Sequence, residues 1–107
     1  MTLFNEREDA FEKQFAHDQE LRFRATARRN KLLGLWVAGR LGKAGDEAEA
    51  YARSVVQADF QEPGDADVLR KIRQDLDGAG KIVDEDELGA KLQQLMAQAI
   101  EEIKSGR

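Results

Sequence analysis

Hydrophobic residues recur at helical spacing in four segments of the chain, and glycine or proline separates these segments. They cover about residues 5–41, 46–61, 65–76 and 84–103. Apolar residues three, four and seven positions apart form one face of an α-helix. The pattern therefore predicts an all-α protein, a four-helix bundle with a long first helix.

The beginning of the first helix differs from the rest. Phe4, Phe11 and Phe15 fall on one face of a helical projection, and charged residues surround them. A short bundle cannot cover this face together with the apolar end of the same helix, because tens of ångströms separate the two. We expect residues 1–20 to be a docking segment that projects or is mobile, and residues 21–107 to form the four-helix domain.

Acidic residues mark the expected helix starts. Asp46 with Glu49, and Asp84 with Glu87, have the spacing of a capping box, in which two side chains satisfy free backbone N–H groups. Asp65 follows a proline and a glycine and is expected to cap the third helix.

Composition limits the classes of site. Charged residues make up 36% of the chain, the net charge is -4, and there is no cysteine. Disulfides and thiolate metal sites are therefore excluded. The acidic N-terminus has no long apolar run, so we expect a cytoplasmic protein without direct membrane insertion.

No catalytic constellation emerges from the sequence. Gly34 and Gly39 have the spacing of a phosphate-binding loop, but Leu41 stands where that loop needs a hydroxyl, so we expect a helix interior. His17 is the only histidine and lacks the partners for a triad or a zinc site. We expect no enzyme activity and no cofactor.

The turn between the last two helices partly matches a calcium loop. Positions 1, 3, 6, 8 and 12 of that pattern are occupied by Asp75, Asp77, Gly80, Ile82 and Asp86. Ala79 replaces one oxygen ligand, and the final aspartate is shorter than the usual glutamate. An acidic turn is the expected outcome, with no metal ligand assigned, and calcium binding stays as an alternative.

Five cations without an intervening acid follow the docking segment, namely Arg22, Arg24, Arg28, Arg29 and Lys31. Such a run is usually a solvated helix face. The acidic chain has too few aromatic residues for base stacking, so we expect no nucleic-acid binding and favour an acidic protein surface as its partner. The predicted partner-binding residues are Phe4, Arg7, Glu8, Phe11, Phe15, His17, Arg22 and Phe23.

Three stretches carry a family resemblance: Phe15–Ala25, Ala27–Trp36 and Gly45–Ala52. They closely resemble the zeta subunit of certain bacterial proton-translocating ATP synthases, over essentially the whole chain. The resemblance implies a four-helix protein that inhibits ATP hydrolysis, with about residues 1–20 inserting as a helix at a catalytic interface between the alpha and beta subunits.

The resemblance also implies the partners and the location. The partner would be the catalytic head of the synthase, formed by the alpha, beta and gamma subunits. The chain would be a monomer when free and peripheral to the inner membrane when bound. The alternative is a calcium- or nucleotide-responsive helical binding module.

Overall fold

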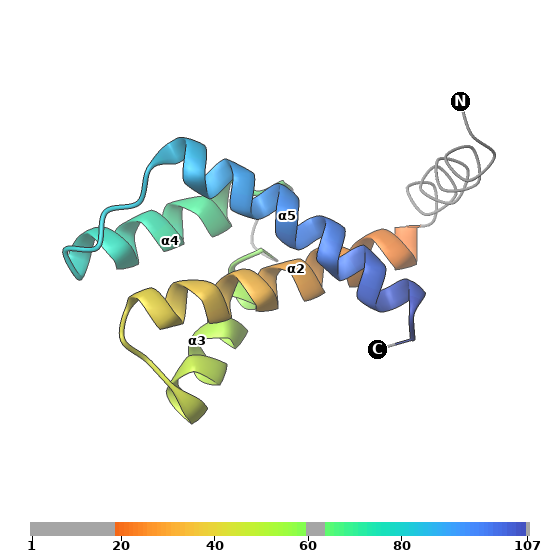
Figure 1. The fold of residues 1–107 in the computed structure, drawn as a ribbon, viewed down its shortest axis with the longest axis horizontal. Coiled ribbons are helices and arrows are strands. Elements are labelled where there is room, and N and C mark those ends of the chain that lie inside the picture. Colours follow the sequence, from red (N-terminus) through yellow and green to blue (C-terminus); the bar gives the residue numbers. More distant parts are fainter. Residues whose placement is uncertain (1–18, 60–63, 107) are drawn as a thin grey trace.

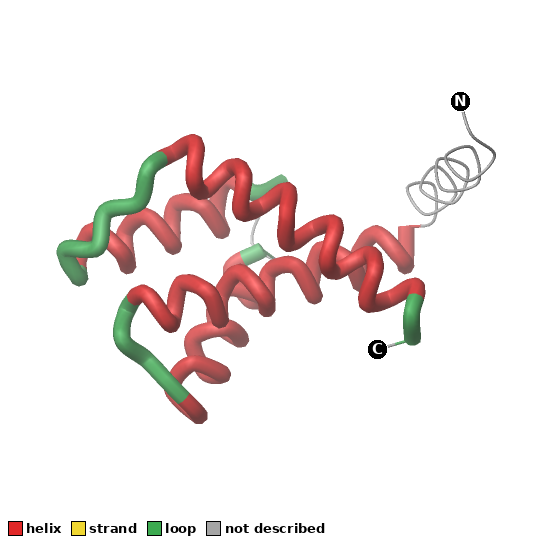
Figure 2. Tube along the Cα trace, in the orientation of Figure 1, coloured by secondary structure: helices red, strands yellow, loops and turns green. Residues whose placement is uncertain are grey.

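The computed structural model describes residues 19–59 and 64–106, and this part of the chain is all-α (Figure 1). The helices are α2 (Gln19–Arg40), α3 (Gly45–Ala58), α4 (Ala66–Gly78) and α5 (Glu85–Lys104). Short turns join α2 to α3 and α4 to α5, and no strand occurs in the described residues (Figure 2). The prediction of an all-α fold with four helices is confirmed, while the expected helical stretch before Gln19 and the predicted end of the second helix lie outside the described residues.

Helix α2 is the centre of the arrangement. Its backbone packs against α3, α4 and α5, whereas α5 approaches within 8 Å, between Cα atoms, of no described helix except α2. The helices α3 and α5 therefore flank α2 without touching each other's backbones.

The core lies where the apolar stripes of the four helices meet. Leu33 and Val37 of α2 are fully buried. The other buried members of the cluster are Val55, Val68, Ile72, Leu76, Leu88 and Leu95. Burying a side chain of this size contributes about 1.5–3 kcal/mol to folding, so this cluster is the main source of stability.

Helices α2 and α3 approach each other closely at Gly34. A Cβ atom at this position would lie 2.6 Å from the Cα of Ala52 and 3.3 Å from a methyl group of Val55. Only a residue without a side chain allows α2 and α3 to approach this closely. The glycine is a helix-interior residue, as expected, and its role is in packing.

The predicted side-chain caps are wrong at all three helix starts. Helix α3 begins at Gly45 with Ala44 before it, so Asp46 lies in the first turn. Asp65 and Asp84 do precede α4 and α5, but neither side chain bonds the first turn. The Asp65 carboxylate instead binds Arg29, and Glu87, the other residue expected in the capping box of α5, pairs with Arg40.

Trp36 lies at the contact between α2 and α5. The guanidinium of Arg40 is 4.5 Å from the ring centre on one side, and the ammonium of Lys91 in α5 is 5.4 Å away. Arg40 also pairs with Glu87, the residue expected in the capping box of α5. These contacts stabilise the packing of α5 on α2 by cation–π attraction and charge.

We predict opposite effects of alanine at two glycines of α2. Gly34→Ala should lower the free energy of unfolding by about 1–3 kcal/mol, because overpacking outweighs the gain in helix propensity. Gly39→Ala, where the new methyl group meets no atom within 4 Å, should raise it by about 0.5–1 kcal/mol. Urea unfolding of both variants measures the difference, and equal stabilities would contradict the close contact.

Candidate partner-binding surface

The first turns of α2 are largely exposed. Figure 1 places this end of α2 at one extremity of the described part of the molecule, beside the C-terminal end of α5. Arg22 and Arg24 are exposed, and the side chain of Phe23 is 58% exposed. Exposed aromatic and guanidinium groups are typical of protein-binding surfaces.

The structure locates two of the eight predicted partner-binding residues, Arg22 and Phe23, and both are accessible there. The other six lie outside the described residues: Phe4, Arg7, Glu8, Phe11, Phe15 and His17.

The cationic run is not one solvated face. Arg29 is only 6% exposed, and its two terminal nitrogens donate to the carboxylate of Asp65 at 2.7 and 3.3 Å. Arg28 pairs with Glu102 of α5 at 3.3 Å. A guanidinium that binds a carboxylate through two hydrogen bonds fixes geometry as well as charge. Arg29 is therefore a structural residue that joins α2 to the start of α4.

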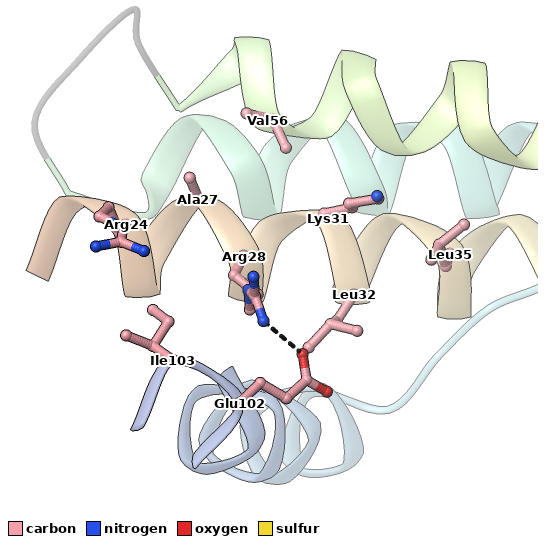
Figure 3. Close-up of a pocket in the computed structure, with 9 residues that line it drawn as sticks. All are labelled: Arg24, Ala27, Arg28, Lys31, Leu32, Leu35, Val56, Glu102 and Ile103. Carbon is pink, nitrogen blue, oxygen red and sulfur yellow. Dashed lines mark hydrogen bonds and ion pairs between the residues drawn. The ribbon is translucent and has the colours of Figure 1, made fainter. Parts of the chain in front are cut away.

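A hollow of about 620 Å³ lies along α2, beside the cationic residues Arg24, Arg28 and Lys31. Figure 3 shows α2 along its length, with Val56 of α3 on one side and Glu102 and Ile103 of α5 on the other. The residues that line it from α2 are Arg24, Ala27, Arg28, Lys31, Leu32 and Leu35. We call this hollow the α2 trough. Its surface combines apolar side chains with cations.

A second hollow of about 330 Å³ continues from the α2 trough across α3. It shares Lys31 and Val56 with the trough and adds Glu49, Arg53 and Gln57. The Lys31 ammonium lies 4.0 Å from the Glu49 carboxylate, at the limit of an ion pair.

Two carboxylates, those of Asp59 and Asp65, interact with Arg29, and Asp67 interacts with Asp59. Burial raises the pKa of Asp59 above its ordinary value; the positive charge of Arg29 opposes this shift and the negative charge of Asp65 adds to it. Asp67 is buried, and its carboxylate accepts a hydrogen bond from Arg70 at 2.8 Å. The carboxylates of Asp65 and Asp59 balance the buried guanidinium of Arg29, which explains why this cation can be inside the fold.

The calcium-loop alternative finds no support among the described residues. The Asp75 carboxylate accepts a hydrogen bond from the Tyr51 hydroxyl at 2.7 Å and from Lys71 at 3.0 Å. Burial, and after it the hydrogen bond to Asp75, raise the pKa of the Tyr51 hydroxyl. In residues 19–59 and 64–106, no three acidic or histidine side chains lie close enough together to hold a metal ion.

The comparisons with known proteins identify the family. The sequence model of ATPase inhibitor subunit zeta matches residues 1–102. The chain belongs to the ATPase inhibitor subunit zeta family. A solution NMR structure of a protein with 53% sequence identity has the same fold, with a TM-score of 0.72, and the match covers 81% of this chain and 99% of that chain. No curated protein matches the sequence.

The family match also indicates the general role and the general partner of the protein. The family is an inhibitor subunit, which is a regulatory and not a catalytic role, and its partner is in general the ATP synthase. Across the described helices, none is both long enough and apolar enough to cross a membrane. In the described part of this zeta-family protein, the start of α2 is exposed and the α2 trough is open to solvent.

Sequence reasoning did not find the α2 trough. Leu32 and Leu35 are apolar residues of the kind expected in a core, yet they line the trough together with Val56 and Ile103. The signal was present, because residues 32–37 are apolar on more than one side of the helix. A helix that is apolar on several sides contacts more than one partner.

Removing the carboxylate of Asp65 tests the structural role of Arg29. Asp65→Ala should lower the free energy of unfolding by about 1–3 kcal/mol, because the buried guanidinium loses two charged hydrogen bonds and keeps only the bonds to Asn30. Asp77→Ala removes an exposed carboxylate from α4 and serves as the control. Thermal unfolding measures both, and an unchanged Asp65→Ala protein would refute the assignment.

The raised pKa of Asp59 predicts a pH-dependent effect. A carboxyl group whose pKa is higher in the folded than in the unfolded chain favours folding when protonated, and this contribution is lost as the pH rises through its folded-state pKa. Asp59→Asn should therefore raise Tm at pH 7 by on the order of 2 °C. The gain should vanish near pH 3, where both proteins are neutral at this position. Melting curves across this range provide the measurement, and a gain that grows toward low pH would have the wrong sign.

Proposed function

We propose that this chain inhibits ATP hydrolysis by the ATP synthase, inserting an N-terminal helix at a catalytic interface between the alpha and beta subunits. The observation that carries the proposal is the family match, which includes the whole of residues 1–20. We assign this segment as the inhibitory element and residues 21–107 as the four-helix domain.

The proposed mechanism is steric. Phe4, Phe11 and Phe15 share one face of a helical projection and would fill apolar pockets of the interface, as amphipathic helices do in protein grooves. Charged neighbours such as Arg7 and Glu8 would set the register, and His17 lies at the end of the segment. An aromatic anchor in a pocket contributes on the order of 2 kcal/mol to binding. A helix held in this way would prevent the interface from changing conformation during hydrolysis and would oppose rotation of the gamma subunit.

The described domain supports this mechanism in two ways. Arg22 and Phe23 are exposed directly after the proposed inhibitory segment, so the contact surface can extend onto α2. The helices α2 to α5 share a buried apolar cluster, and a folded domain of this width would limit how far the segment can enter. We place the protein in the cytoplasm, as a monomer when free and at the inner membrane when bound to the synthase.

Inhibition should depend on the N-terminal segment and on its aromatic face. Removing residues 1–18 should abolish inhibition of ATP hydrolysis by the purified cognate enzyme, while helicity and cooperative melting of the remaining chain persist. Phe11→Ala combined with Phe15→Ala should weaken inhibition by on the order of a hundredfold or more, since two anchors are lost. ATPase rates measured against inhibitor concentration give both values.

A matched control is available on the opposite face of the same segment. Glu6→Ala combined with Lys13→Ala leaves the net charge unchanged and alters positions about 180° from the phenylalanines on a helical projection. This double variant should inhibit nearly as well as the natural chain. Undiminished inhibition by the chain without residues 1–18 would show that another part of the molecule is responsible.

A further inference from the structure

The α2 trough offers apolar surface that the core does not use up. Leu32, Leu35 and Val56 line it and are only partly buried (Figure 3). Its sides are α3 and α5, whose backbones do not approach each other. From Arg24 to Leu35 its floor covers three helical turns of α2, about 16 Å at 1.5 Å per residue. The trough is therefore long enough to receive one face of a helix of about three turns.

The cations along this surface exceed the carboxylates. Among the described residues that line the α2 trough and the second hollow, four are cations and two are carboxylates. Arg24 and Arg53 are exposed and form no ion pair within residues 19–59 and 64–106. Lys31 is exposed and pairs only at the 4.0 Å limit. Positive charge beside apolar surface is thus available to a partner of opposite charge.

The trough adjoins the exposed start of α2. Arg22 and Phe23 are exposed, and Arg24, the first residue of the trough, follows them within the same helical turn. Aromatic and arginine side chains are enriched at protein–protein interfaces. A partner that contacts Arg22 and Phe23 therefore has a continuous path along α2 into the trough.

The chemistry of the trough favours a protein helix as its occupant. None of the described lining residues is aromatic, so the surface lacks a platform for stacking bases. A lipid bilayer is broad and flat, which fits poorly into a hollow between two helices. A helix docked in a groove is recognised through an apolar stripe with charges at its edges. A helix whose apolar stripe is bordered by carboxylates matches both the leucines and the cations of the trough.

We propose that the α2 trough is a second docking site for the ATP synthase, and that it receives an acidic amphipathic helix of the catalytic head. Apolar side chains of that helix contact Leu32, Leu35 and Val56, and its carboxylates lie beside Arg24 and Lys31. This inference rests on the proposed function, because the family match supplies the ATP synthase as the partner.

Docking in the trough contributes affinity and does not itself block hydrolysis. Two linked contacts bind more tightly than either alone, because the second contact forms at a high effective concentration. Loss of the trough contact should therefore raise the concentration needed for half-maximal inhibition and leave the maximal inhibition unchanged.

A designed peptide tests the chemistry of the site on the full-length protein. The probe is a helical peptide of about five turns with a leucine stripe bordered by glutamates, added to isotope-enriched protein at low salt. It should shift the NMR amide signals of Leu32, Leu35 and Val56 and leave those of α4 near Arg70 in place. A peptide with lysines in place of the glutamates should bind about tenfold more weakly or worse. Equal binding of the two peptides, or shifts outside the trough alone, would overturn the inference.

Charge reversal in the trough supplies the specific variant. Arg24 and Lys31 are both exposed, so Arg24→Glu with Lys31→Glu should fold, which circular dichroism verifies. This double variant should bind the purified catalytic head on the order of tenfold more weakly. The loss should lie mainly in slower association and should shrink at high salt. Inhibition at saturating concentration should stay complete.

Two control variants separate the trough from net charge and from folding. Lys43→Glu with Lys81→Glu changes the net charge equally at two loop positions that do not line the trough. Arg24→Lys with Lys31→Arg keeps both positive charges in the trough. Both controls should bind the catalytic head nearly as well as the natural chain. Equal affinities of the two charge-reversed variants would overturn the inference.

Two other occupants of the trough have distinct signatures. For an anionic membrane, phosphatidylglycerol vesicles would broaden the signals of Leu35 and Val56 and the acidic peptide would not shift them. For a second copy of the chain, these signals would depend on the protein concentration in the absence of any peptide. Either result would overturn the inference.

The tests of the trough and of the proposed function have separate outcomes. Loss of inhibition without residues 1–18, with equal affinities of the two charge-reversed variants, overturns the trough contact and leaves the proposed function standing. Weaker binding of the variant with Arg24→Glu and Lys31→Glu, together with undiminished inhibition by the shortened chain, supports the trough and contradicts the proposed inhibitory segment.

Discussion

The backbones of α2 and α3 meet at Gly34 with no side chain between them. This approach positions α3 against one side of α2 and leaves the remaining sides of α2 for α4 and α5. Because α2 carries all three contacts, its apolar residues must face several directions at once. Leu33 and Val37 enter the core, and Trp36 meets α5. The arrangement of the described domain thus follows from one close-packed pair of helices.

In this arrangement the cationic side chains of α2 point in different directions. Arg29 points toward the start of α4 and is buried against Asp65, whereas Arg24 and Lys31 face the trough between α3 and α5. Adjacent positions in a helix differ by about 100°, so one run of positive residues serves both the stability of the fold and a surface. The protein keeps positive side chains on the surface of α2 although its overall charge is negative.

Helical periodicity was sufficient to predict the class of fold, the approximate limits of the helices and the buried stripes of α4 and α5. It could not predict which side chains meet across the fold. Glu87 has the spacing of a capping residue, yet it pairs with Arg40, and Asp65 binds Arg29 and not the first turn of α4. Such choices depend on the relative placement of helices, which sequence spacing does not contain. The exposure of Arg22 and Phe23 could be predicted from the sequence. The trough could not, because an apolar residue such as Leu35 is expected in the core when the separation of α3 and α5 is unknown.

Trp36 gives the protein a built-in optical probe. It is the only tryptophan, and Lys91 of α5 lies over its ring. Since, among the described helices, the backbone of α5 packs against α2 alone, separation of α5 can change the indole emission while α2, α3 and α4 keep their helical circular dichroism. Fluorescence and circular dichroism therefore report two different parts of the same domain. Without any added dye, the natural sequence can distinguish the detachment of its last helix from the loss of the whole fold.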